Sequence, residues 1–428
     1  MDRYYRVKST SFETINKEKI GKRKEKSKKK KKSKEKPGKA KLSILIATFW
    51  DYPHTGGLSN YITTLSNGLK KQGHKVDIVS PNQFSSAKVG ELREAVVPEL
   101  KTFFHNRYGT SNSKIIQSSR LLYIYEEMLK KMDLSKYDIF HAQDLFTANI
   151  LGRFNESYGK PLFFTPHGMF TFSRLQFNRI EKGSIEEVYY TEMERKAIQF
   201  ASHIIILSDS FREPLKKLGA IESKMTTVNT GIDFDDKAAK KGAKKSNSLV
   251  ISTVARLGPR KGHKYLLDAL NQVRKHIANA EVLIVGDGEM RTELEEQAKT
   301  LNLTNVKFLG TRDDVPKILG QTDIFVLPTI NDNLPISIIE AMHSGTAIIS
   351  TNCGGIPEII KNYQTGIIVE PGDSKALATA IRYLLNNPTN REKIATNAYQ
   401  YAKKHLTSDA MLLTIEDIYN RFLDREKG

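Results

Sequence analysis

The chain has 428 residues, of which 39% are hydrophobic and 27% are charged. This composition supplies packed cores and excludes global disorder, collagen and coiled coil, and at ~150 residues per domain the length predicts two or three domains. No apolar run approaches the ~18–20 residues of a membrane span, and the charged N-terminus lacks the apolar core of a secretory signal. The single cysteine, Cys353, allows no internal disulfide, which favours a reducing, cytoplasmic compartment and excludes a cysteine-rich metal site.

The positive charge is concentrated at the N-terminus. The net charge is +19, and residues 1–41 contain 18 Lys or Arg against five Asp or Glu. Because this segment has few large apolar residues and no apolar period, we expect a disordered Lys-rich tail. Such a tail either attracts an anionic membrane, RNA or an acidic polymer, or is a solvated extension without a specific partner. Binding through counterion release needs no specificity, so no specific nucleic acid is predicted.

Short apolar runs alternate with helical stretches after the tail. The first array is predicted to contain strands at 42–49, 75–80, 138–141, 161–165 and 203–207, and helices at 58–72, 145–158 and 184–200. A polar segment at 235–248 has no large apolar residue and predicts a linker. The second array is predicted to contain strands at 249–254, 281–285, 306–308, 323–327 and 347–350, and helices at 263–276, 289–301, 335–343 and several places between 375 and 422.

The strands are continuous apolar runs, which is typical of parallel sheets covered by helices on both faces. Two such arrays predict an α/β protein with two doubly wound, Rossmann-like domains, residues 42–240 and 241–428, facing a central cleft. The terminal helices are expected to pack back on the N-terminal domain. Ligands bind at the carboxyl ends of strands in such sheets, so the cleft is the expected site.

Two loops that follow strands carry residues suited to a phosphorylated ligand. Gly56-Gly57 follows the first strand and permits close approach of the backbone, although the same pair is ordinary in turns. It is not G-x-G-x-x-G, so a dinucleotide site is not supported. Arg256 and Lys261 follow a strand of the second array and suit a diphosphate, Arg through its planar fork and Lys as a point charge. The alternative for these cations is a solvated basic loop.

The sharpest feature is an acidic pair, Asp332 and Glu340. Glu340 is the only acidic residue of an apolar helical stretch, so its carboxylate needs partners, and sugar hydroxyls would supply them. Asp332 precedes the helix and suits the same ligand. The alternative is that Glu340 pairs with a basic residue or faces solvent. Gly286 follows another strand and either admits a ligand or forms a tight turn.

Four further side chains are candidates near an acceptor or a reacting carbon. His167 ends the strand at 161–165 and either donates to a ligand oxygen or is a hydrogen-bonded structural residue. Asp51, His54 and His141 are weaker candidates for contact with an acceptor. The sequence has no H-E-x-x-H and no close His pair, and no metal site is predicted.

Together these features resemble the retaining glycosyltransferases of the GT-B fold, the glycogen-synthase-like group called family 4. The resemblance covers nearly all of residues 42–428 and says little about the substrate. The motifs that carry it are Gly56-Gly57, Thr165-Pro-His167-Gly168, Arg256 with Lys261-Gly262, Val285-Gly-Asp-Gly288, Phe308-Leu-Gly310, Asp332 to Glu340, and Gly354-Gly-Ile-Pro-Glu358.

The resemblance implies a role for each matching position. Arg256 and Lys261 would hold the donor diphosphate and stabilise the leaving group, and Glu340 would bind the ribose hydroxyls. Asp332 would contact hydroxyls of the transferred sugar, and His167 would contact that sugar near the anomeric carbon. The remaining donor contacts that we expect are Gly57, Gly286, Leu334, Pro335 and Ile336.

The expected activity is transfer of a hexosyl group from a nucleotide-diphosphate sugar to a hydroxyl of a glycan, glycolipid or cell-surface polymer. The resemblance implies retention of anomeric configuration with no cofactor and no metal. Asp332 departs from the Glu-x7-Glu pattern of the family, which leaves the sugar open. The alternatives are a nucleotide-sugar hydrolase or epimerase of the same fold, or a polyanion-binding coat protein on an enzyme scaffold. We expect a cytoplasmic protein, held peripherally at an anionic membrane or polymer by its tail.

Overall fold

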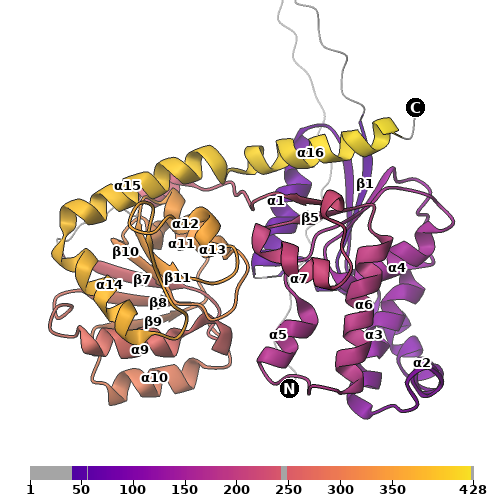
Figure 1. The fold of residues 1–428 in the computed structure, drawn as a ribbon, viewed down its shortest axis with the longest axis horizontal. Helices are drawn as coiled ribbons and strands as arrows, with labels where there is room; N and C mark the ends of the chain where they lie inside the picture. The colour runs from indigo at the N-terminus through magenta and orange to yellow at the C-terminus, as the bar shows by residue number, and fades with distance from the viewer. Residues whose placement is uncertain (1–40, 55, 242–247, 426–428) are drawn as a thin grey trace, which may run out of the picture. The chain divides into compact units, whose positions relative to one another are not determined.

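Two six-stranded parallel sheets organise the computed structural model, which describes residues 41–54, 56–241 and 248–425 (Figure 1). The strand order is β2-β1-β3-β4-β5-β6 in the first sheet and β12-β11-β10-β7-β8-β9 in the second. Neighbouring strands are parallel throughout both sheets. The predicted α/β fold with two doubly wound sheets is confirmed. The predicted Lys-rich tail lies outside the described residues.

The strands occupy the apolar runs of the sequence. Those of the first sheet are β1 (Ser43–Ala47), β2 (Lys75–Val79), β3 (Ile139–Ala142), β4 (Leu162–Phe164), β5 (His203–Ile206) and β6 (Met225–Thr227). Those of the second are β7 (Val250–Val254), β8 (Glu281–Val285), β9 (Val306–Gly310), β10 (Ile324–Leu327), β11 (Ala347–Thr351) and β12 (Ile367–Val369). The outer strands β6 and β12, of three residues each, were not predicted.

Helices cover both faces of each sheet, and short 3-10 helices join them. In the first half they are α1 (Gly57–Lys71), α2 (Ser86–Tyr108), α3 (Ser113–Leu129), α4 (Leu145–Asn155), α5 (Phe170–Gln176), α6 (Ile185–Phe200), α7 (Arg212–Lys217), η1 (Pro81–Gln83), η2 (Asp209–Phe211) and η3 (Glu222–Lys224). In the second half they are α8 (Asp236–Lys241), η4 (Pro259–Lys261), α9 (His263–Gln272), α10 (Arg291–Thr300), α11 (Val315–Leu319), α12 (Ile336–His343), α13 (Ile356–Ile359), α14 (Ser374–Asn386), α15 (Pro388–His405) and α16 (Ser408–Arg425).

The short helices α5, α7, α11 and α13 were not predicted, and two further regions differ from the prediction. The long helices α2 and α3 stand between β2 and β3, where no element was predicted; α2 contains Pro98 and has little amphipathic periodicity. The polar linker predicted at 235–248 begins instead with the helix α8, whose six residues pack against α11. In both regions tertiary packing stabilises helices that the local pattern does not specify.

The last helix, α16, follows α15 directly and packs against α1 and the first sheet, which lie far from it in sequence (Figure 1). Its side chains Met411, Leu412, Ile415 and Tyr419 are buried in the same core as Ile44 and Ile46 of β1. A Cβ atom at Gly68 of α1 would lie 2.0 Å from a methyl carbon of Leu412, so only glycine permits this approach. The helix therefore joins the C-terminal end of the chain to the core of the first sheet.

Each sheet has one point where the strand order reverses, between β1 and β3 in the first and between β7 and β10 in the second. Loops that leave such strands diverge to opposite faces and open a crevice at the carboxyl edge, where ligands bind in doubly wound sheets. The segments at these two points are 48–56 and 143–144 in the first sheet and 255–262 and 328–335 in the second.

Candidate active site

A cavity of about 620 Å³ lies at the carboxyl ends of the strands and is lined by loops from both sheets. The first sheet contributes residues that follow β1, β3 and β4, and the second contributes residues that follow β7 and β8. Four predicted site residues line it: His54, His167, Arg256 and Lys261. The cavity therefore brings candidate side chains from both arrays into one site.

Lys261 and Asp332 form an ion pair at the switch point of the second sheet. Each side chain is 18% exposed, so solvent screens this pair little. Lys261 ends η4, and the following Gly262 has a φ of 71° and begins α9. A Cβ atom at Gly262 would lie 1.9 Å from the carbonyl oxygen of Pro328, so the glycine lets the two loops touch. This close approach places the lysine beside Asp332.

Arg256 stands at the mouth of the same cavity and is 75% exposed. Its Nη2 lies 3.0 Å from Oε2 of Glu289, which follows β8. Arg179 of the first half approaches the other carboxylate oxygen of Glu289 at 3.8 Å. Lys261 and Arg256 are thus each paired with a carboxylate, and an anionic ligand would compete with Asp332 and Glu289 for them.

Glu340 lies on α12, whose other side chains are largely apolar. No hydrogen bond or ion pair engages its carboxylate within the part of the chain that the structure describes. Burial raises the pKa of this carboxyl from 4.5 to about 7, because the charged form loses hydration without gaining a partner. The structure therefore does not support the alternative of a core ion pair, and Glu340 is not among the residues that line the cavity.

The predicted backbone contacts of the donor are not among the residues that line the cavity: Gly57, Gly286, Leu334, Pro335 and Ile336. A Cβ atom at Gly57 would lie 3.8 Å from Cδ1 of Ile336, so the beginnings of α1 and α12 face each other. Leu334 is buried. A Cβ atom at Gly286 would lie 1.9 Å from the carbonyl oxygen of Ala255. Gly286 thus has a packing role, and its predicted donor contact is not supported.

His167 follows β4 and faces Gln143, which follows β3. The Nε2 atom of His167 lies 3.0 Å from Oε1 of Gln143, and the ring meets that of Tyr61 edge to face at 4.8 Å. Burial lowers the pKa of His167 to about 3, so the ring is neutral. Pro335, which precedes α12, is buried and makes no part of the contact among His167, Gln143 and Tyr61.

The sequence reasoning missed several polar residues and an apolar wall in the first half of the cavity; besides Gln143 and Asp144 the polar ones are Ser173, Arg174, Arg179 and Glu194. Gln143 and Asp144 line it directly after β3, and Asp144 accepts hydrogen bonds from the backbone N–H groups of Phe49 (2.6 Å) and Thr147 (2.9 Å). Burial raises the pKa of Asp144. The apolar wall is formed by Trp50, Phe146, Phe164, Met169, Phe170 and Phe177. The signal that was available is position, because residues 143 and 144 leave the strand next to the switch point.

The three weaker acceptor candidates have different surroundings. His54 is exposed and lines the cavity, whereas Asp51 is exposed and lies outside the lining. His141 is fully buried, with Nδ1 2.6 Å from the hydroxyl of Tyr419 and Nε2 2.7 Å from that of Thr165. Burial also lowers its pKa to about 3. His141 therefore joins β3 and β4 to α16, and this burial does not support its predicted contact with an acceptor.

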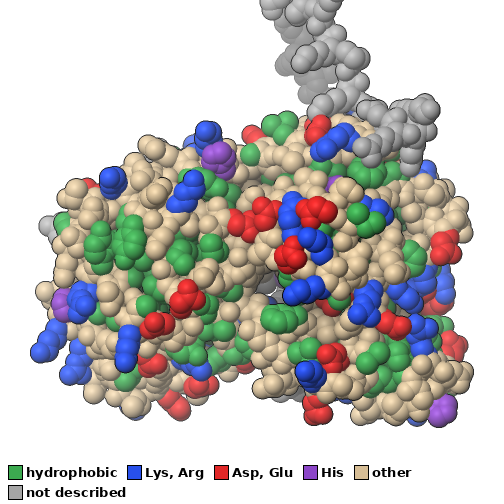
Figure 2. Space-filling model, viewed as in Figure 1, with side chains coloured by type: hydrophobic (Ala, Val, Ile, Leu, Met, Phe, Trp, Pro, Cys, Tyr) green, Lys and Arg blue, Asp and Glu red, His purple; other side chains and the backbone are tan. Residues whose placement is uncertain are grey.

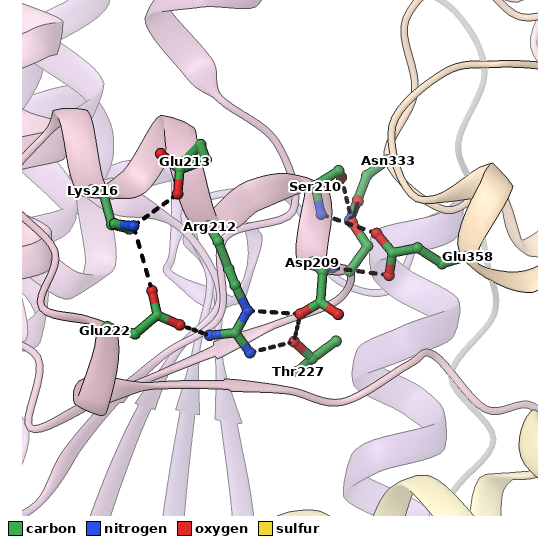
Figure 3. A network of polar contacts seen from close by, with 10 residues as sticks. Asp209, Ser210, Arg212, Glu213, Lys216, Glu222, Thr227, Asn333 and Glu358 are labelled. Carbon is green, nitrogen blue, oxygen red and sulfur yellow. Dashed lines mark hydrogen bonds and ion pairs between the residues drawn. The ribbon is translucent and has the colours of Figure 1, made fainter.

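A polar contact joins the two halves beside the Asp332 loop (Figure 3). Glu358 of α13 accepts hydrogen bonds from the backbone N–H groups of Asp209 and Ser210, both at 2.9 Å. Ser208 donates to Oδ1 of Asn333 at 2.7 Å. We call these three hydrogen bonds the clasp; its glutamate belongs to the Gly354-Gly-Ile-Pro-Glu358 motif, to which sequence reasoning assigned no role.

Arg212 extends the clasp on the first half and binds Asp209 at 2.7 Å and Glu222 at 2.6 Å. Side chains of both signs gather over α7 on the face shown in Figure 2. These outer ion pairs are exposed, so they contribute little beside the two backbone hydrogen bonds of Glu358.

Neither a metal cluster nor a membrane-spanning helix is found in the part of the chain that the structure describes. No group of three or more His, Cys, Asp or Glu side chains there has the arrangement of a metal site. No helix there combines the length and the apolar character needed to cross a membrane.

Comparison with known proteins identifies the class of this fold. Sucrose-phosphate synthase from Thermosynechococcus elongatus superposes with a TM-score of 0.71 at 18% identity and covers 90% of this chain and 100% of its own. Anabaena HepE, solved in complex with UDP, superposes with a TM-score of 0.66 at 19% identity over 89% of this chain and 100% of HepE. The two sheets and their shared cavity therefore form a GT-B fold.

Sequence comparison then identifies the family. The profile of "Glycosyl transferases group 1" matches residues 234–401, and that of "Glycosyltransferase Family 4" matches residues 55–236. The UDP-Gal:alpha-D-GlcNAc-diphosphoundecaprenol alpha-1,3-galactosyltransferase of Escherichia coli is 30% identical over 308 residues, 68% of this chain and 76% of its own. The chain belongs to the group 1 glycosyl transferases, and the protein is an enzyme that transfers glycosyl groups.

Proposed function

We propose that the protein transfers a hexosyl group from a nucleoside-diphosphate sugar to a hydroxyl of a glycan or lipid-linked acceptor, with retention of anomeric configuration. One observation carries the proposal: a single cavity is lined by Arg256 and Lys261 from one sheet and by His167 from the other. An activated sugar has an anionic end and a hydroxylated end, and this cavity offers cations to the first and neutral polar groups to the second.

The two cations stabilise the departing nucleoside diphosphate. Lys261 is little exposed and is paired with Asp332. A phosphate oxygen that binds Lys261 therefore meets a cation that is already largely desolvated, and it shares this cation with Asp332. Charge that develops on the leaving group then gains more from Lys261 and Arg256 than the same charge would gain in water. Asp332, beside Lys261, is placed to accept hydrogen bonds from hydroxyls of the transferred sugar.

Glu340 holds the ribose of the donor. Its carboxylate has no polar partner among the described residues and a pKa raised to about 7 by burial. Two adjacent hydroxyls of a ribose would supply the donors that this carboxylate lacks. The facing beginnings of α1 and α12 supply backbone N–H groups on either side of the diphosphate.

The reaction proceeds on the face of the sugar where the leaving group departs. The acceptor hydroxyl forms a bond to the anomeric carbon as the bond to the phosphate oxygen breaks, and that oxygen takes the acceptor's proton. The new glycosidic bond has the configuration of the old one. Two protein cations take the place of a divalent ion in this scheme, so the transfer is metal independent and needs no cofactor.

The acceptor lies against the aromatic wall of the first half. Apolar rings such as Phe146 and Phe177 suit the face of a sugar or the start of a lipid, and Arg174 suits an anionic group. The E. coli relative is named for an acceptor with a diphosphoundecaprenol, and HepE is solved with UDP-glucose. These relatives support a role in glycan or polysaccharide biosynthesis with a UDP-sugar or a similar donor.

The test is product analysis with UDP-, GDP- and ADP-sugars, each with and without candidate glycan and polyprenyl-diphosphate acceptors. Proton NMR of the anomeric signals gives the product and its configuration. We expect an acceptor-dependent glycoside with the donor's configuration, unchanged by EDTA. Inversion would contradict the mechanism, and free sugar or an epimerised donor formed equally without acceptor would favour the hydrolase or epimerase alternative.

The Lys-rich tail supports a second proposal, peripheral attachment of a cytoplasmic enzyme to an anionic surface. Vesicles that contain phosphatidylglycerol should retain the full chain at low salt and lose it at high salt. A variant that lacks residues 1–41 should not bind, while its transfer to a soluble acceptor stays within about twofold. Equal vesicle binding by both proteins would contradict this attachment.

A further inference from the structure

Gln143 is fully buried and yet lines the cavity. It directly follows β3, and its backbone N–H donates to the carbonyl oxygen of Ala47 in β1 at 2.9 Å. The backbone of Gln143 is therefore held by the two strands at the switch point, β1 and β3, rather than by a loop.

The contact between Gln143 and His167 determines where the ring carries its proton. The Oε1 atom of an amide only accepts hydrogen bonds, so Nε2 of His167, 3.0 Å away, must be the donor. The ring is buried and neutral, and Nδ1 is then unprotonated. Tyr61 packs against the ring edge to face and fixes its plane. His167 thus offers the cavity a hydrogen-bond acceptor.

The amide nitrogen of Gln143 has no hydrogen-bond partner within the described residues. Unpaired N–H groups in a buried site destabilise the fold, which a structural amide avoids. Asn149, a buried amide in the same half, shows the contrast: its Nδ2 donates to the carbonyl oxygens of Leu145 (2.7 Å) and Met193 (2.6 Å). Gln143 lines the cavity, and its amide nitrogen is buried with its hydrogen-bonding capacity unused.

We propose that Gln143 is a positioning residue for the transfer reaction: it fixes His167 with Nδ1 free to accept a hydrogen bond from one hydroxyl of the transferred sugar, and its own amide donates to a neighbouring hydroxyl. A pyranose carries adjacent hydroxyls that each donate and accept, so it matches this pair. The inference rests on the proposed function, because it takes the transferred sugar as the ligand beside His167.

The first test is a double-mutant cycle on kcat/KM for the donor. Gln143→Met keeps the length of the side chain and removes both hydrogen-bonding functions. We expect kcat/KM to fall about tenfold, the effect of ~1.4 kcal/mol, when His167 is present, and by a clearly smaller factor, the loss of the amide's own contact alone, in a His167→Ala background. The same factor in both backgrounds, or no effect in either, would overturn the proposal.

The second test needs no substrate. In protein labelled with 15N-histidine, the Nε2–H signal of His167, assigned by its loss in His167→Ala, should exchange slowly in the unliganded enzyme. It should be lost in Gln143→Met and retained in Gln143→Glu, which still accepts from Nε2. An unchanged signal in Gln143→Met would overturn the role of Gln143 even if transfer is confirmed, and failure to find any donor would leave this result intact.

The matched control is Asn155→Ala at the end of α4. Asn155 makes two hydrogen bonds with the backbone of Lys160 in the same half, at 2.6 and 2.8 Å, and does not line the cavity. It should lower Tm without changing the His167 signal or kcat/KM. If Gln143→Met does not fold, Gln143→Asn, which withdraws the amide by one methylene, replaces it with the same expected outcomes.

Discussion

The carboxyl edges of the two sheets have the same topology but carry side chains of different chemistry. At the edge of the second sheet, Lys261 and Arg256 are cations held by the carboxylates of Asp332 and Glu289. At the edge of the first, His167 is a neutral ring held by an amide and an aromatic side chain. One edge compensates charge, and the other arranges neutral hydrogen-bonding groups beside an apolar wall.

This difference shows how a doubly wound sheet is adapted to its ligand. In both halves the switch point determines where the site lies, and the side chains that follow its strands determine the chemistry of the site. Substitutions on the charged edge should therefore act mainly on turnover and nucleotide binding. Substitutions in the packing that joins the halves should act on stability.

The largest effect is expected from Lys261→Ala. The variant loses a cation opposite the leaving group and leaves the Asp332 carboxylate unpaired beside the phosphate, so both changes oppose the transition state. Turnover should fall at least tenfold, or ~1.4 kcal/mol, and about a hundredfold if both effects add. Lys307→Ala, which removes an exposed pair with Glu281, is the matched control. Activity of Lys261→Ala within twofold of the native enzyme would contradict the assignment.

Glu340→Gln should weaken nucleotide-sugar binding and remove its pH dependence. The ionised carboxylate accepts hydroxyl hydrogens, and its pKa in the unliganded enzyme is about 7. Native affinity should therefore rise as pH increases from 6 to 8, measured calorimetrically with a nucleotide sugar whose diphosphodiester does not titrate in this range. The variant should bind about threefold to tenfold more weakly at pH 8, the effect of one hydrogen bond to a charged group. A pH-independent native affinity would argue against this carboxylate as a ribose ligand.

The raised pKa of Glu340 also predicts how the stability of the protein depends on pH. Its pKa is raised from 4.5 to about 7 on folding, so the folded state disfavours the ionised form. The unliganded native protein should lose stability as pH rises from 4.5 through 7. Glu340→Gln should therefore have the higher Tm at pH 8 and should lose this advantage near pH 4. The reverse order at pH 8 would mean that the carboxylate has a partner in the unliganded state.

Glu358→Ala should destabilise the fold by about 1 kcal/mol, because two backbone N–H groups of η2 lose their acceptor. Glu222→Ala, which removes only exposed ion pairs with Arg212 and Lys216, should cost less than about 0.5 kcal/mol. Urea unfolding of both variants measures the difference. Equal losses would show that the clasp contributes no more than a surface ion pair.

The smallest change is expected from Tyr419→Phe. It removes the hydroxyl that bonds Nδ1 of His141, which should cost about 1 kcal/mol or less of stability and leave KM for donor and acceptor unchanged. Thermal unfolding and initial rates test this together. A raised acceptor KM with an unchanged Tm would return His141 to the acceptor site.

The sequence allowed the charged edge to be predicted and left most of the neutral edge unseen. Lys261 and Asp332 are unusual residues at the ends of apolar strands, and the structure pairs them. Gln143 is an ordinary polar residue at such a place, and its significance comes from a neighbour 24 residues away. The aromatic wall was missed because a phenylalanine that lines a cavity has the same local pattern as one in a core.

The helices show the same limit. Both sheets could be predicted from continuous apolar runs, because a strand that is buried on two faces consists mainly of apolar residues. The helices α2 and α3 leave no such trace, since α3 buries one side against α2 and the sheet while α2 has little periodicity. The clasp depends on Glu358 meeting backbone groups about 150 residues earlier, which no local pattern reports.

The central claim is that one cavity between the two sheets holds an activated sugar. A crystal structure with whichever of UDP, GDP or ADP raises Tm most tests it directly. We expect the diphosphate within hydrogen-bond distance of Arg256 and Lys261, with the ribose hydroxyls on Glu340. A nucleotide bound away from these three side chains would contradict the account.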